Sequence, residues 1–86
     1  MVDLQKKRWY FFLWDEHNID QLERHGIVPD EAEEAFFNRY FIAKNKGRRQ
    51  PPRFRIDGVT NSHRNLRLIV EDLGKNVARV ITGWDL

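Results

Sequence analysis

The chain has 86 residues, of which 41% are hydrophobic and 13% aromatic, and its formal net charge is +2. This length allows about one small domain with a single core, so we expect one domain over residues 1–86. The chain contains no cysteine, which excludes disulfides and thiolate metal sites.

The first predicted element is a strand in the segment RWYFFLW, residues 8–14. The segment is aromatic, contains neither glycine nor proline, and is short enough for a strand buried on both faces. We therefore expect Phe11 and Phe12 in the core together with Trp9.

Two short helices should follow this strand. Asp15 is a suitable cap for the first helix, and Gly26 suits the left-handed position at its end. Pro29 suits the first position of the second helix, which we expect to reach about Asn38. Core-facing positions are expected at Ile19 and Leu22 in the first helix and at Ala32, Ala35 and Phe36 in the second.

The rest of the chain predicts four strands. Residues 40–43 form a short apolar run, and the basic, proline-containing loop KNKGRRQPP separates it from RFRIDG at residues 53–58. Residues 66–73 and 77–82 flank a turn at residues 74–76, as in a β-hairpin. The predicted order is β-α-α-β-β-β-β, an α+β fold with two helices packed on one face of a mainly antiparallel sheet.

Charge is distributed unevenly along the chain. Residues 15–34 contain eight acids and one base, a net charge of −7, whereas residues 44–67 contain eight bases and one acid, a net charge of +7. The second segment as a whole therefore predicts attraction to a polyanion such as RNA, although for each single charge the favoured interpretation is a place on one of two solvated faces that attract each other.

Several motifs resemble one known family. The segment WDEHNIDQLERHGIVPDEAEEAFFN, residues 14–38, resembles the opening signature of the BrnT family of toxin-antitoxin ribonucleases. That signature has a Trp-Asp pair, an Asn in the first helix, a basic-His-Gly corner and a Glu-Ala-rich second helix ending in Phe. The segments RFRIDGVT and LRLIVEDLGKNVARVIT resemble the Arg-led strand and the C-terminal hairpin of that family.

The resemblance implies a compact RelE-like fold and a cytoplasmic toxin that cleaves RNA without a metal or other cofactor. It also implies a cognate antitoxin protein as partner, with the toxin either dimeric or in a toxin-antitoxin hetero-oligomer. No apolar run approaches the roughly 20 residues needed to cross a bilayer, and the chain start lacks a signal-peptide pattern, so we expect no membrane partner.

Metal-free RNA cleavage needs a base, an acid and cations that hold the charge growing on the phosphate. His25 is the proton-carrier candidate that the motif match favours, but a histidine at a helix C-terminus is also explained by the helix dipole alone. Arg53 and Arg55 are cation candidates because alternation places them on one sheet face. Arg79 is either a third cation or a structural partner of Glu71 or Asp72. The predicted catalytic set is His25, Arg53, Arg55, Arg79 and Thr82.

Thr82 and Trp84 mark a departure from the family. BrnT members often end the hairpin with Ser-Ala-Arg and a further helix, whereas this chain has TGWDL. Thr82 can replace the serine hydroxyl, but Trp84 cannot replace a phosphate-binding arginine and is instead a candidate for stacking on a base. The predicted RNA-binding set is Arg24, Lys46, Arg48, Arg49, Arg64, Arg67 and Trp84.

Two other functions remain open at this point. The first is a non-catalytic RNA- or protein-binding module with the same fold, which the Trp84 departure permits. The second is a structural interaction domain that uses the acidic helices; it explains the charge asymmetry but not the motif match.

Overall fold

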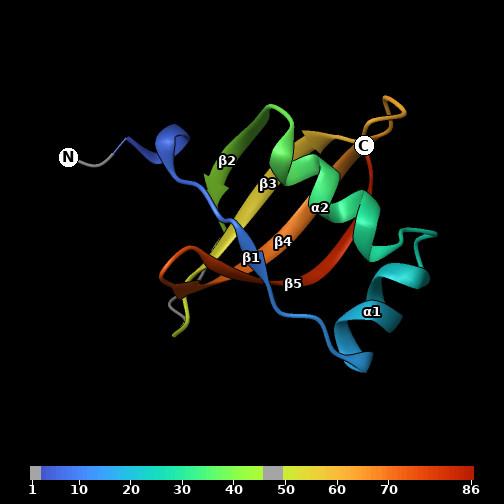
Figure 1. The fold of residues 1–86 in the computed structure, drawn as a ribbon, viewed down its shortest axis with the longest axis horizontal. Coiled ribbons are helices and arrows are strands. Elements are labelled where there is room, and N and C mark those ends of the chain that lie inside the picture. Colours follow the sequence, from blue (N-terminus) through green and yellow to red (C-terminus); the bar gives the residue numbers. More distant parts are fainter. Residues whose placement is uncertain (1–2, 46–49) are drawn as a thin grey trace.

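The computed structural model describes residues 3–45 and 50–86, which form an α+β fold with two helices and one five-stranded sheet (Figure 1). The sheet order is β1-β5-β4-β3-β2. Only β1 runs parallel to its neighbour β5, and the other pairs are antiparallel. The predicted class, element order and mainly antiparallel sheet are confirmed. The elements are η1 (Leu4–Lys6), β1 (Phe11–Phe12), α1 (Glu16–Glu23), α2 (Pro29–Phe37), β2 (Tyr40–Lys44), β3 (Arg53–Val59), β4 (Asn65–Gly74) and β5 (Val77–Asp85).

Helix α1 begins and ends as predicted. The Asp15 side chain accepts from the backbone N–H of Asn18, and the Asn18 side chain accepts from the N–H of Asp15. Asn18 is buried and also donates to the carbonyl of Leu13, so the Trp-Asp and Asn parts of the motif have a structural role. At the other end Gly26 has φ +68°, the left-handed conformation that glycine adopts without a Cβ clash.

Helix α2 begins at Pro29 without a side-chain cap from Val28. The carboxylate of Glu31 instead accepts the backbone N–H of Val28 at 3.2 Å. Ala32, Ala35 and Phe36 are buried, which confirms the predicted core-facing side of this helix.

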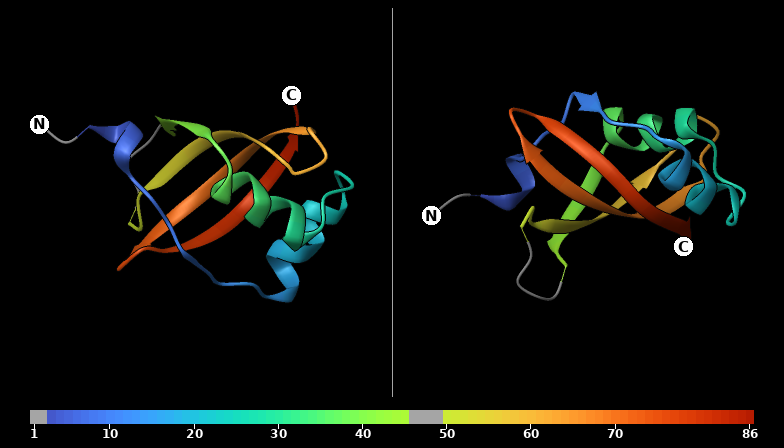
Figure 2. Two further views of the ribbon diagram at one scale, coloured as in Figure 1. Left: turned by 45° about the horizontal axis from the view of Figure 1, so that its top comes forward. Right: turned by 90° about the horizontal axis from the view of Figure 1, so that it is seen from below.

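Both helices lie on one face of the sheet, as the views in Figure 2 show. Glycines in two strands allow their close approach. A Cβ at Gly58 of β3 would lie 2.9 Å from the carbonyl oxygen of Ala35 in α2. A Cβ at Gly83 of β5 would lie 3.3 Å from a methyl group of Leu22 in α1. These contacts identify the face of the sheet that the helices cover.

The N-terminal strand differs from its prediction. Only Phe11–Phe12 forms a strand, and it lies at the edge of the sheet beside β5. Trp9 is buried and Phe12 packs against the core, but Tyr10, Phe11 and Leu13 are more than half exposed. The prediction of burial on both faces, and of Phe11 in the core, was wrong because the helices cover only one face of the sheet, so that Phe12 packs on the core and Phe11 lies on the other face. None of the described helices is long and apolar enough to cross a membrane.

Candidate functional site

The face of the sheet opposite the helices carries six of the nine predicted site residues that the structure describes. Along β3, Phe54, Ile56 and Gly58 are buried toward the helices, so Arg53, Arg55 and Asp57 point to the other side. We call this side the open face. It is formed by β2, β3, β4 and β5, whose side chains alternate between the two faces.

Strand register arranges the open face into three rows that cross the sheet. The first row is Arg53, Glu71 and Arg79. The second row is Ala43, Arg55, Ile69 and Thr82. The third row is Phe41, Asp57, Arg67 and Trp84. Six predicted residues thus share one face: Arg53, Arg55, Arg67, Arg79, Thr82 and Trp84.

An irregularity in β5 is necessary for this arrangement. Val70 pairs with Val80 and Ile69 pairs with Thr82, so Ile81 is an extra residue in β5. Strict alternation from Arg79 would turn Thr82 toward the helices, whereas the extra residue brings Thr82 and Trp84 to the same face as Arg79. The bulge therefore decides which C-terminal side chains belong to the site.

Three of the open-face arginines hold carboxylates. Arg67 donates from Nε and Nη2 to the two oxygens of Asp57, at 2.8 and 2.9 Å. These hydrogen bonds lower the pKa of Asp57 and raise the pKa of Arg67. Arg53 and Arg79 both approach Glu71, at 3.2 and 3.8 Å. The structural alternative that the sequence suggested for Arg79, a partner of Glu71, is therefore present.

Arg79 has a second partner, outside the sheet. Its Nη2 lies 3.0 Å from the carboxylate of Asp15, the cap of α1. The pKa of Asp15 is lowered first by the backbone N–H of Asn18 and then by Arg79. This contact ties the start of α1 to β5.

Arg55 differs from its neighbours on the open face. Within the described part of the chain it forms no salt bridge, while its charge contributes to the lowered pKa of Asp57. Its cross-strand neighbours are Ala43 and Ile69, and Thr82 follows one strand further. Arg55 is therefore the cation of this face with the greatest freedom to bind an added anion.

His25 lies at the corner between α1 and α2 and not on the sheet. Its ring is exposed and its centroid lies 6.4 Å from the ring centroid of Trp84, at an interplanar angle of 54°. This contact places the imidazole at the edge of the open face, next to the third row. Arg24, which precedes it, is exposed at the end of α1.

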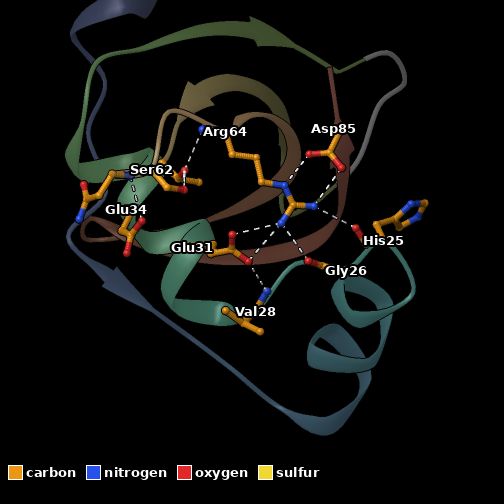
Figure 3. A network of polar contacts seen from close by, with 10 residues as sticks. His25, Gly26, Val28, Glu31, Glu34, Ser62, Arg64 and Asp85 are labelled. Atoms are coloured by element: carbon orange, nitrogen blue, oxygen red, sulfur yellow. Dashed lines mark hydrogen bonds and ion pairs between the residues drawn. The ribbon is translucent and has the colours of Figure 1, made fainter.

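Arg64 has a structural role at the same corner (Figure 3). Its guanidinium donates to the carbonyls of Gly26 at 2.9 Å and of His25 at 3.2 Å. It also binds the carboxylates of Glu31 and Asp85. The His25 ring points away from this network, so Arg64 holds the backbone of the corner and leaves the imidazole free. Arg64 therefore has a structural role at the corner and does not lie on the open face with Arg67.

Three of the predicted RNA-binding residues, Lys46, Arg48 and Arg49, lie outside the described residues. Phe41, which is 70% exposed on β2, was not among the predicted site residues. The sequence contains no signal for this exposure, because Tyr40, Phe41 and Ile42 are all apolar and only the structure shows that Phe41 faces outward. Among residues 3–45 and 50–86, no three His, Asp or Glu side chains come together in a way that could hold a metal ion.

Comparison with known proteins gives no assignment. No protein-family model matches the chain, and neither a curated protein nor a solved structure is similar to it. The motifs, the open face and the His25 corner are therefore the features that indicate a function.

Proposed function

We propose that this protein binds RNA on the open face of its sheet and cleaves it as a metal-independent endoribonuclease of the toxin type. The observation that carries the proposal is the register that gathers Arg53, Arg55, Arg67 and Arg79 on one helix-free face. Arginine is suited to this task because its planar guanidinium binds two phosphate oxygens and keeps its charge.

The chemistry would divide between the open face and the corner. Arg55 would hold the phosphate whose charge grows during attack by the 2′-hydroxyl. His25 is the candidate for proton transfer because its ring is exposed beside Trp84, at the edge of the face. Thr82 lies in the same row as Arg55 and offers a hydroxyl as a further hydrogen-bond donor.

The partner and the fold family belong to the same proposal. The resemblance of residues 14–38 to BrnT toxins supports a RelE-like ribonuclease, and such a toxin requires an antitoxin that blocks its RNA-binding surface. We propose that the antitoxin covers the open face, because that would neutralise the toxin by occlusion. Coexpression of the adjacent small reading frame, followed by copurification, tests this partner.

A second function has its own support. Arg53, Arg67 and Arg79 each hold a carboxylate, and these ion pairs reduce the charge available to phosphate. A protein with this arrangement could bind RNA and not cleave it. The second candidate is therefore an RNA-binding module without catalysis.

One experiment separates the two candidates. Purified protein is incubated with single-stranded RNA in the presence of EDTA, and both binding and cleavage products are measured. Cleavage under these conditions supports the ribonuclease, and binding without cleavage supports the module. Cleavage that requires added divalent ions contradicts the metal-independent mechanism, and the absence of both binding and cleavage contradicts both candidates.

A further inference from the structure

The third row of the open face has an exposed aromatic ring at each end. Phe41 on β2 is 70% exposed and Trp84 on β5 is 36% exposed. Between them the register places Asp57 and Arg67 as a bidentate ion pair. We call these four residues the aromatic row.

A side chain as large as Phe41 that is 70% exposed requires an explanation. Its strand neighbours Tyr40 and Ile42 are buried, so the strand has a clear inner side and Phe41 lies on the outer one. Exposed aromatics on a sheet that also carries arginines are typical of surfaces that stack unpaired bases. Phe41 has this character, and Arg39 at the same pocket and Arg55 on the same face supply positive charge near it.

We propose that Phe41 and Trp84 are two stacking sites for bases of single-stranded RNA, with the phosphates between them lying over Arg67 and Arg55. The inference rests on the proposed RNA-binding function. It adds a base-binding residue, Phe41, that was not among the predicted site residues, and pairs it with Trp84, which was.

The spacing of the row supports the choice of single strands. Neighbouring strands lie about 4.8 Å apart, so the backbones at Phe41 and Trp84 are separated by roughly 14 Å. Successive phosphates of a strand in a stacked helix rise by only about 3.4 Å. The two rings can therefore hold two bases of one strand only if these bases leave their stacked neighbours, and in a duplex both faces of an interior base are already covered.

A shallow pocket at Phe41 gives the first stacking site a polar rim. The pocket has a volume of about 420 Å³, and its lining includes Arg39, Phe41, Asp57, Val59, Asn65 and Leu86. Val59 and Leu86 add apolar surface beside the ring. The Asn65 amide both donates and accepts, and the Asp57 carboxylate accepts, so together they can read the hydrogen-bonding edge of a base.

Charge favours RNA over an apolar protein segment as the occupant. Arg39 is exposed at the rim of the pocket, and Arg55 and Arg67 lie on the same face with Asp57. The Arg67–Asp57 pair uses Nε and Nη2 of Arg67, which leaves Nη1 for a phosphate oxygen. An apolar protein partner that covers Phe41 is the competing occupant, and the experiment below distinguishes it.

The test measures the affinity of the full chain for a short fluorescent single-stranded RNA. Phe41→Ala and Trp84→Ala are each expected to weaken binding at least about 5-fold, because each removes one stacked base. The slope of affinity against salt should stay unchanged, because neither substitution removes a charge. Phe41→Trp should retain the affinity, because it keeps an aromatic surface.

Phe37→Ala is the matched control. Phe37 is 64% exposed, but it lies at the end of α2, on the helix-covered side of the sheet. Its substitution should leave RNA affinity at the wild-type value. The thermal unfolding of each variant is measured in parallel, and Phe41→Ala should unfold near the wild-type temperature because its ring is exposed.

The outcomes are distinct. Wild-type RNA binding that is unaffected by Phe41→Ala overturns the stacking sites but leaves the proposed function intact, and Phe41 is then a surface for a protein partner. Equal weakening by Phe37→Ala also overturns the proposal, because the effect would not be specific to the row. If the wild-type chain binds no RNA at all, the proposed function itself fails, and the stacking sites fail with it.

Discussion

Arg64 donates from two nitrogens to both carboxylate oxygens of Asp85, and this pair joins the turn before β4 to the end of β5. The same guanidinium binds Glu31 of α2 and the carbonyls of His25 and Gly26. One side chain therefore connects the sheet, the second helix and the corner between the helices.

Arg64→Ala should lower the free energy of unfolding by roughly 1–2 kcal/mol, since several hydrogen bonds are lost but the pairs are partly exposed to water. Urea unfolding measures the change. Arg24→Ala removes the same charge from the exposed end of α1 and should change stability by less than about 0.5 kcal/mol. Equal losses in the two variants would contradict the connecting role of Arg64.

The aspartate pairs predict a loss of stability in acid. Hydrogen bonds from Arg67 and Arg64 lower the pKa values of Asp57 and Asp85 below the ordinary 3.8. A carboxyl group with a lowered folded-state pKa stabilises the fold above the unfolded pKa, and this contribution is lost as the pH falls below about 4. Asp57→Asn should therefore be less stable than wild type at pH 7, and the difference should shrink toward pH 3.

Unfolding in urea at both pH values tests this dependence. Asp20→Asn, at an exposed position of α1, provides the comparison. A wild-type advantage over Asp57→Asn that is as large at pH 3 as at pH 7 would show that the Asp57 pair does not titrate in this range.

Arg55→Ala should weaken RNA binding and reduce the slope of affinity against salt by about 1, because one fewer counterion is released. It should also slow cleavage, since Arg55 is the open-face arginine without a salt bridge among the described residues. Lys75→Ala removes one positive charge from the exposed hairpin turn and serves as control. The same slope change in both variants would mean that net charge alone attracts RNA.

His25→Asn should leave the fold nearly unchanged, with a loss of at most about 1 kcal/mol, because Arg64 holds the backbone carbonyl and the ring is exposed. If the imidazole transfers a proton, the cleavage rate should fall about 10²-fold or more. The pH profile of the wild-type rate should then contain a limb that the variant lacks. A wild-type rate in His25→Asn would show that His25 is only a corner residue.

Gly26→Ala is the companion variant at this corner. It should destabilise the fold by about 1 kcal/mol, because an alanine Cβ is unfavourable at a φ of +68°. This loss should occur whether or not His25 takes part in catalysis. The variant therefore distinguishes the effect of the backbone conformation of the corner on stability from a catalytic role of His25.

Gly58→Ala should destabilise the protein by roughly 2–3 kcal/mol, because the added Cβ would lie 2.9 Å from the Ala35 carbonyl oxygen and force α2 away from β3. Thermal unfolding measures the loss. At Gly74 a Cβ would meet no atom within 4 Å, although φ is +85° there. Gly74→Ala should therefore show only backbone strain, about 1 kcal/mol, and an equal or smaller loss in Gly58→Ala would contradict the close packing of α2.

Local patterns in the sequence were sufficient to predict the helices, the order of the strands along the chain and part of the open face. Alternation in residues 53–59 predicted that Arg53 and Arg55 share a face, because side chains on a strand point in turn to either side. The cap at Asp15 and the left-handed Gly26 were also predictable, since each depends on residues within one helical turn.

Tertiary structure decided the features that depend on residues far apart in the chain. The extra residue Ile81 places Thr82 and Trp84 on the open face, and only pairing with β4 reveals it. The opposite charges of residues 15–34 and 44–67 did not identify the individual ion pairs between them, such as Arg64 with Glu31. Phe11 is exposed because it lies on the face of the sheet that the helices do not cover, and long-range contacts that local periodicity does not encode decide which face is covered.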